Sequence, residues 1–106
     1  MNNYLVKFRE LAWESPRPGV RHKFQNVGDR CLRLAEFTEE FIELDWCSRE
    51  HIGYVIEGQV MVRFEKQNVL LRKGDVLHIP AGHDHRHKAI VAKGEKAVLL
   101  FFEDVR

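Results

Sequence analysis

Short runs of apolar residues recur along most of the chain at brief intervals. The runs are rich in Val, Ile, Leu, Phe and Tyr and are separated by turn-forming residues, which is the pattern of an all-β protein. The runs that we expect to form strands are Val20–Val27, Cys31–Phe37, Phe41–Cys47, His51–Ile56, Gln59–Glu65, Val69–Arg72, Val76–Ile79, His85–Val91 and Lys96–Glu103. Helical periodicity is weak except within Tyr4–Trp13, where Leu5, Phe8 and Leu11 share one face of a helix. The sequence therefore predicts one β domain with at most one short helix near its start.

A cluster of turn-forming residues interrupts the chain at Ser15-Pro16-Arg17-Pro18-Gly19. Each Pro restricts its own backbone and that of the residue before it, so neither a helix nor a central strand continues through this segment. We therefore expect an N-terminal arm over residues 1–19, either as a short helix or as a strand exchanged between subunits. A barrel domain over residues 20–106 is expected to follow it.

Glu57 and Gly58 lie between two apolar runs and fit the two-residue turn of a β-hairpin, because glycine tolerates positive φ. The register of such a hairpin pairs Val55 with Val60 and places paired residues on the same face. The face that this register predicts to be interior consists of His51, Gly53, Val55, Val60, Val62 and Phe64. An imidazole among such neighbours must find a hydrogen-bond partner or a metal to offset its desolvation.

The composition narrows the classes of partner. The 17 Lys and Arg residues nearly balance the 16 Asp and Glu residues, so there is no electrostatic argument for binding nucleic acid or an anionic membrane. The longest purely apolar run, Ala97–Phe102, is far shorter than the roughly 20 residues that a spanning helix needs. Cys31 and Cys47 form no Cys-x-x-Cys pair, and residues 1–13 have no apolar core typical of a secretory signal. A small-molecule ligand and a cytoplasmic location are the resulting expectations.

One stretch carries a specific motif. Gly74, Pro80, Gly82 and His85 follow the spacing Gly-x5-Pro-x-Gly-x2-His. Gly74 allows a turn into a strand, Pro80 and Gly82 bend the chain at the end of that strand, and His85 is expected to begin the returning strand with its side chain inward. This stretch resembles the second conserved motif of the cupin superfamily at each of these positions. The Asn that trails the family motif is replaced by Ala89 here.

The first cupin motif, His-x-His-x3,4-Glu-x6-Gly, is matched at its end, where Gly58 is in place and His51 occupies the position of the Glu. Its two leading histidines are absent. With a three-residue spacer their positions hold Asp45 and Cys47, and with a four-residue spacer they hold Leu44 and Trp46.

Two arrangements of these leading positions are open. If Phe41–Cys47 is a strand, the alternation of apolar and polar residues favours Leu44 and Trp46 as the inward residues. A bulge or loop after Cys47 would instead turn its thiol inward. Cys47 is therefore either a ligand or an ordinary buried thiol.

The resemblance implies a double-stranded antiparallel β-barrel, or jelly roll, in which His51 and His85 converge on one internal site. It implies that this site binds a divalent transition metal, Zn, Fe, Mn or Ni. Cys47 is a candidate third ligand, because a thiolate with two imidazoles is a reasonable set for zinc. His87, which lies two residues after His85 on the same strand face, is a further internal candidate.

The ligand expected beside the metal is a small oxygen-rich metabolite. The candidate pocket residues are Trp46, Tyr54, Val62, Phe64 and His87, although Trp46 and Tyr54 also fit as core or interface aromatics. The resemblance is compatible with a metal-dependent isomerase or dioxygenase and does not choose a reaction, because one barrel supports many chemistries. The alternative is a metal-free module that binds a sugar or another metabolite. A homodimer is also expected, because small cupins of this type commonly pair.

Overall fold

The computed structural model describes residues 4–105 and confirms the all-β fold. Within this range the chain forms eight strands and two single-turn 3-10 helices. In chain order these elements are η1 (Phe8–Glu10), β1 (Glu14–Arg17), β2 (Val20–Val27), β3 (Arg30–Thr38), β4 (His51–Phe64), β5 (Asn68–Arg72), β6 (Val76–Ile79), η2 (His83–His85), β7 (His87–Ile90) and β8 (Lys96–Asp104). No helix among the described residues is long and apolar enough to cross a membrane.

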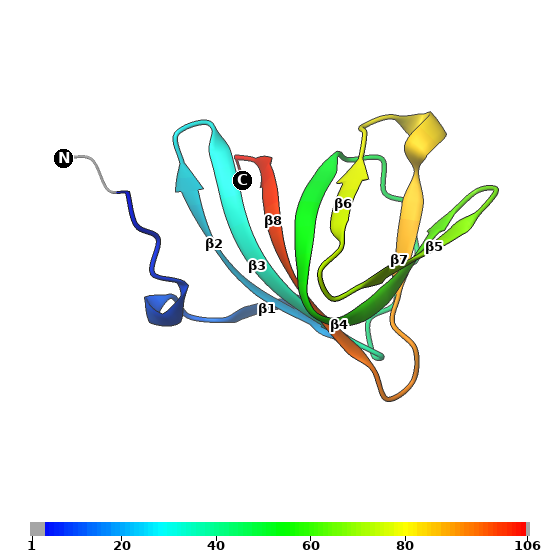
Figure 1. Cartoon of the computed structure of the whole chain (residues 1–106), viewed down its shortest axis with the longest axis horizontal. Coiled ribbons are helices and arrows are strands. Elements are labelled where there is room, and N and C mark those ends of the chain that lie inside the picture. Colours follow the sequence, from blue (N-terminus) through cyan, green and yellow to red (C-terminus); the bar gives the residue numbers. More distant parts are fainter. Residues whose placement is uncertain (1–3, 106) are drawn as a thin grey trace.

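The strands form a curled antiparallel sheet of jelly-roll type in which β4 is shared between two halves. Strands β1, β2, β3, β8 and the first half of β4 lie in that order, and β6 pairs with the other edge of this first half. The second half of β4 pairs with β5 on one edge and β7 on the other. Figure 1 shows β4, in green, curving from one half of the molecule into the other.

The hairpin predicted at Glu57 and Gly58 is wrong, because the chain continues through both residues as one strand. A register shift against β8 between Val55 and Glu57 marks a bulge, and Gly58 has a φ of 76°. A Cβ on Gly58 would lie 1.8 Å from the Lys96 carbonyl oxygen, so glycine is required both by its conformation and by its close neighbour. Because the bulge shifts the alternation by one residue, Val55 and Val60 are nevertheless both buried, as the hairpin register also required.

Residues 39–50 form a connection rather than the predicted strand Phe41–Cys47. The segment has one isolated bridge, in which Cys47 pairs with His87. The last half of the motif stretch also differs from expectation, because His83–His85 form the turn η2 and the returning strand begins two residues later, at His87. The remaining predicted strands correspond to observed ones.

One contiguous hydrophobic core fills the space enclosed by the curled sheet. Its members alternate along the strands with residues that face outward, as period-two patterning requires. The core residues are Ala35, Val55, Val60, Val62, Leu71, Leu77, Ile79, Val91, Ala97, Leu99 and Phe101.

The N-terminal arm joins the sheet through β1, which pairs with β2 at the edge. Its helix is reduced to the single turn η1, and the Trp13 ring lies beneath the Arg21 guanidinium at 4.2 Å and the Lys23 ammonium at 4.6 Å. Figure 1 shows the segment before β1 leaving the body of the molecule. The start of the predicted arm, residues 1–3, and the end of the predicted barrel domain, residue 106, lie outside the described residues. Exchange of the arm between subunits stays a prediction.

Candidate metal centre

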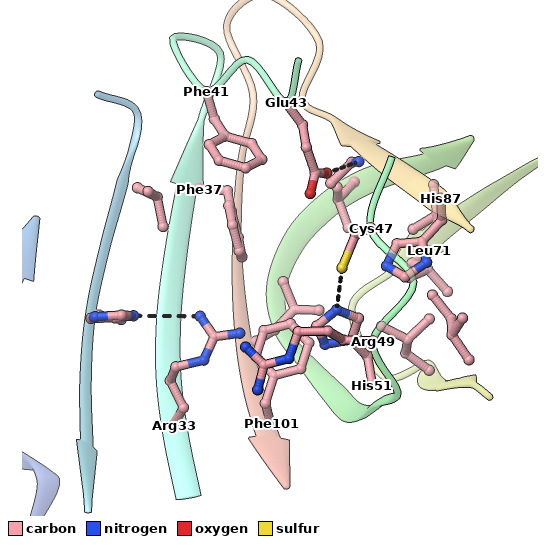
Figure 2. A pocket seen from close by; sticks show the side chains of 18 of the residues that line it. Arg33, Phe37, Phe41, Glu43, Cys47, Arg49, His51, Leu71, His87 and Phe101 are labelled. Atoms are coloured by element: carbon pink, nitrogen blue, oxygen red, sulfur yellow. Dashed lines mark hydrogen bonds between the residues drawn. The ribbon is translucent and has the colours of Figure 1, made fainter. Parts of the chain in front are cut away.

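Cys47, His51 and His87 form a compact cluster inside the curled sheet. Each contributes one potential metal-binding atom, and these three atoms lie within 4.8 Å of one another. Cys47 belongs to the connection before β4, His51 is the first residue of β4 and His87 is the first residue of β7. Two backbone hydrogen bonds of 2.9 Å, one in each direction between Cys47 and His87, hold the connection against β7. The thiol is thereby fixed beside both imidazoles, as Figure 2 shows.

The His51 ring is oriented by a buried carboxylate. Its Nδ1 lies 2.9 Å from Oε2 of Glu103, and an ionised carboxylate can only accept a hydrogen bond, so Nδ1 carries a proton. Nε2, the nitrogen on the other side of the ring, lies 3.5 Å from Cys47 Sγ. A carboxylate that fixes the tautomer in this way is the usual partner of a histidine that binds a metal.

Glu103 is in turn held by Arg33. The Arg33 guanidinium donates from Nε and Nη2 to the two carboxylate oxygens, at 2.8 and 2.9 Å, in a bidentate pair. Only 3% of Glu103 is exposed, and Arg33 is also buried. Arg33 and Glu103 are both removed from water, so the loss of either partner would leave the other as an unpaired buried charge. The orientation of the His51 ring therefore depends on an intact Arg33–Glu103 ion pair.

His87 is oriented by the backbone. Its Nδ1 lies 3.1 Å from the His85 carbonyl oxygen, to which it donates, so Nε2 is left with a lone pair. Only 5% of His87 is exposed, and its ring meets the His51 ring edge-on at a centroid distance of 5.0 Å. Both histidines therefore hold their Nδ1 protons away from the cluster and leave Nε2 as the nitrogen that can bind a metal.

The three ionisable groups of this network have shifted pKa values. The hydrogen bond from His51, the largest effect, lowers the pKa of Cys47 to about 6, against the effect of burial. Burial alone would lower the pKa of His51, but its hydrogen bonds to Cys47 and Glu103 outweigh burial and raise the pKa to about 9. Burial likewise opposes ionisation of Glu103, yet the Arg33 and His51 hydrogen bonds hold its pKa well below the usual range. Without a metal, the cluster is a thiolate–imidazolium pair near neutral pH.

This pairing predicts the pH dependence of the Cys47 thiol in the metal-free protein. Because its pKa is lowered, the thiolate should be present above about pH 6 and lost below it, instead of titrating near the ordinary value of 9.0. Thiolate absorbance measured against pH, with the Cys47→Ser spectrum subtracted to remove Cys31, checks this. In His51→Ala the midpoint should move back toward 9.0, and a wild-type midpoint near 9.0 would contradict the pairing.

A cavity of about 330 Å³ opens beside the cluster and contains Cys47, His51 and His87 among its lining residues. Most of its wall is apolar, with three aromatic rings, those of Phe37, Phe41 and Phe101, on one side (Figure 2). The charged lining residues are Arg17, Arg33, Glu43 and Arg49. The arrangement combines donor atoms for a metal with space for a small organic molecule, which is the general composition of a ligand site.

The structure brings some of the predicted site residues together and places others elsewhere. His51, Cys47 and His87 meet in the cluster, and Val62 lines the cavity. Phe64 lines a second cavity instead. Trp46 and Tyr54 line neither of these two cavities, and both are exposed. The expectation that Trp46 and Tyr54 line the ligand pocket is therefore corrected.

His85 does not converge with His51. It lies at the end of η2, is exposed and lines the second cavity, although it occupies the motif position. The 3-10 turn redirects the chain, so that the first inward side chain after the bend is that of His87. The contribution of His85 to the cluster is its carbonyl oxygen, which accepts the His87 hydrogen bond.

The expectation that Leu44 and Trp46 face inward is also corrected. Strand alternation does not apply to a segment that is not a strand, and Leu44 is 79% exposed. Cys47, the second leading position under the three-residue spacer, lines the cavity instead, whereas Asp45, the first, is exposed and does not line it. Glu43, two residues before Asp45, also lines the cavity. The Glu43 carboxylate accepts a hydrogen bond of 2.7 Å from the Ala89 backbone N–H.

The sequence interpretation missed Arg33, Glu103 and Arg49. For Arg33 and Glu103 the sequence contains a usable signal. Both occupy positions of β3 and β8 whose side chains alternate toward the buried face, between or beside apolar residues. A charged residue in such a phase requires a buried partner. Arg49 lies in an irregular segment, where no periodicity indicates direction.

Comparison with known proteins agrees with the fold. The family model described as a cupin domain matches residues 42–102. The uncharacterized protein YdbB of Bacillus subtilis (strain 168) is 36% identical over an alignment of 85 residues, with coverages of 76% of this chain and 73% of that protein. Among solved structures, KdgF from Halomonas sp. is similar with a TM-score of 0.73 and 25% identity, covering 92% of each chain. The polyketide cyclase RemF from Streptomyces resistomycificus has a TM-score of 0.80 and 17% identity, covering 99% of this chain and 81% of its own.

Proposed function

The chain belongs to the cupin domain family, and we propose that it binds a divalent transition metal through Cys47, His51 and His87 and presents it to a small molecule in the adjacent cavity. The single observation that carries this proposal is the convergence of one sulfur and two nitrogen atoms at the cavity wall. Three protein ligands with an open fourth position are the arrangement of catalytic zinc sites.

The donor set fits zinc in both chemistry and spacing. With bond lengths of about 2.3 Å to sulfur and about 2.0 Å to nitrogen, sulfur and nitrogen ligands of a tetrahedral zinc lie about 3.5 Å apart. Cys47 Sγ and His51 Nε2 are 3.5 Å apart. The low pKa of Cys47 supplies the thiolate that a metal requires, and His51 would give up its Nε2 proton on binding. Among the metals expected from the sequence, the thiolate favours zinc over Mn.

A zinc ion in this place would act as a Lewis acid toward an oxygen atom of the bound molecule. The protein's own contributions are separate from that chemistry. Glu103 holds the His51 ring, the His85 carbonyl holds the His87 ring, and the apolar wall excludes water from the bound molecule. The isomerase and dioxygenase reactions suggested by the family resemblance remain proposals, and no residue found at the site decides between them.

The test is a titration of the metal-free protein with zinc, in which binding is measured by isothermal titration calorimetry. The protein is prepared without a histidine tag. We expect one zinc per chain and release of about one proton from the His51 and Cys47 pair. A parallel titration of the Cys31→Ala variant should give the same result, because Cys31 is not a member of the cluster of donor atoms. Absence of zinc uptake would sink the metal proposal and favour the alternative, a metal-free module in which the same cavity binds a metabolite.

We also propose that two copies of the chain form a homodimer through the outer face of the sheet. This face exposes apolar side chains from neighbouring strands β4, β6 and β8, among them Tyr54, Ile56, Val76 and Phe102. Adjacent exposed apolar residues of this kind are typical of an interface. Light scattering in solution should give twice the mass of one chain, and the mass of a single chain would contradict the dimer.

A further inference from the structure

Positive charge gathers on the wall of the cavity beside the candidate metal centre. Three lining residues are arginines, Arg17, Arg33 and Arg49, whereas one lining residue, Glu43, carries a carboxylate. The charge is therefore local, because the whole chain has a formal net charge of only +1.

Arg49 is an exposed residue of the cavity wall, and its guanidinium is available to a ligand. It lies two residues after Cys47 in the connection before β4, and within residues 4–105 its guanidinium has no hydrogen bond or ion pair with another side chain. Figure 2 shows this guanidinium pointing toward that of Arg33, on the side of the cavity where Phe101 lies. Arg33 and Arg49 both line this cavity, and an anion bound in it would reduce the repulsion between their positive charges.

Arg33 adds a buried donor on the same side. Its Nε and Nη2 are committed to Glu103, while Nη1 makes a single contact of 3.5 Å with His22 Nδ1. The guanidinium also covers the Phe101 ring at 4.6 Å from the centroid. Its plane is thus locked by packing and by the carboxylate, which leaves an N–H group of fixed direction at the cavity wall.

The balance of charges indicates how many negative charges a ligand should bring. Glu103 is paired with Arg33, and Glu43 is the one lining carboxylate beside the two remaining arginines, Arg17 and Arg49. One positive charge at the cavity is left uncompensated. A monoanion would neutralise it, whereas a dianion such as phosphate would leave an excess of negative charge beside Glu43.

The rest of the wall indicates the body of the ligand. Phe37 packs edge-on against Phe41 and Phe101, with centroid distances of 5.1 and 6.5 Å, and aliphatic core residues complete the lining. Such a wall stabilises an apolar group by removing it from water and offers few partners for hydroxyl groups. An apolar body with one acidic group fits this cavity better than the oxygen-rich metabolite expected from the sequence.

We propose that the cavity binds a small monocarboxylic acid with an apolar body, whose carboxylate is held by the Arg49 guanidinium with the help of Arg33. This inference deepens the proposed function and rests on it for the assignment of this cavity as the ligand site. It does not require the metal, because the arginines are present in the metal-free protein.

The experiment compares 3-phenylpropionate with 3-phenylpropionamide, which has nearly the same shape and no charge. Calorimetric titrations of the metal-free and zinc-loaded wild-type protein should show that the acid binds at least about tenfold more tightly than the amide, since a hydrogen bond to a charged group contributes more than a neutral one. In Arg49→Gln this preference should disappear while the affinity for the amide stays unchanged. Arg63→Gln removes the same charge from an exposed position on β4 outside the cavity, and it should behave as the wild type.

Equal binding of acid and amide by the wild-type protein, or an unchanged preference in Arg49→Gln, would overturn the proposal. Inorganic phosphate that displaces the acid at equal concentration would overturn the assignment of a monoanion with an apolar body. The zinc stoichiometry of Arg49→Gln is measured in parallel and should stay at the wild-type value. If the wild-type protein binds no zinc, the proposed metal centre is wrong but the proposed acid site is not affected. The reason is that binding of the acid is also measured in the metal-free protein.

Discussion

Replacing His87 with alanine is expected to lower the affinity for zinc by about 100-fold or more, whereas replacing His85 should leave it unchanged. His87 Nε2 is one of the three donor atoms that meet at the cavity, and its removal leaves only Cys47 and His51. The His85 side chain is exposed and points into the second cavity, so only its backbone carbonyl serves the cluster. Alanine at position 85 keeps that carbonyl.

Competition for zinc against a chromophoric chelator measures both affinities under the same conditions. Thermal unfolding of the metal-free variants provides the control, because a loss of affinity counts only where the fold is retained. The opposite result, with affinity lost in His85→Ala and kept in His87→Ala, would mean that the motif position holds the metal and that the cluster in the structure does not.

Glu103→Ala is expected to destabilise the protein by about 3–5 kcal/mol, which is the usual cost of removing one partner of a buried ion pair. The Arg33 guanidinium would keep its charge in a buried position and lose both of its short hydrogen bonds. His51 would lose its acceptor at Nδ1 as well. Denaturant unfolding of the metal-free proteins at neutral pH measures this cost as a change in the free energy of unfolding.

The double variant Arg33→Met with Glu103→Met separates the unpaired charge from the loss of packing. It should be much closer to the wild type in stability, because no buried charge is left without a partner. Its zinc affinity should still fall by about 10–100-fold, since His51 is no longer oriented by a carboxylate. A Glu103→Ala variant as stable as the wild type would show that the Arg33 charge is not buried in solution.

The strands were predictable from alternation, whereas their connections were not. β2, β6 and β8 follow directly from apolar runs bounded by turn residues. The Glu57-Gly58 pair is compatible with a hairpin turn and with a bulge, because both use positive φ at a glycine. The choice between them depends on which strands pair with β4, and pairing with β8 is a contact between residues more than 35 positions apart in sequence.

The site was predictable in composition more than in arrangement. His51 was expected inside the fold from the alternation of its strand, and Cys47 was left open as a ligand. His85 was expected inside because the motif was interpreted as an extended strand directly after the bend. The turn η2 uses His83–His85 to complete the bend, which moves the first inward position to His87. A backbone turn of three residues has no periodic signal in the sequence.

The shared strand β4 has a consequence for how the molecule opens. Its first half pairs with β6 and β8 and its second half with β5 and β7, and the chain passes between the halves through the bulge near Glu57 and Gly58 as one continuous strand. Neither sheet can therefore detach without straining a strand on which the other depends, so local unfolding of one half is coupled to global unfolding. His51 is the first residue of β4, so a ligand or metal bound there would stabilise both halves against unfolding. The protein would behave as one cooperative unit, and its kinetic resistance to unfolding would rise when the site is filled.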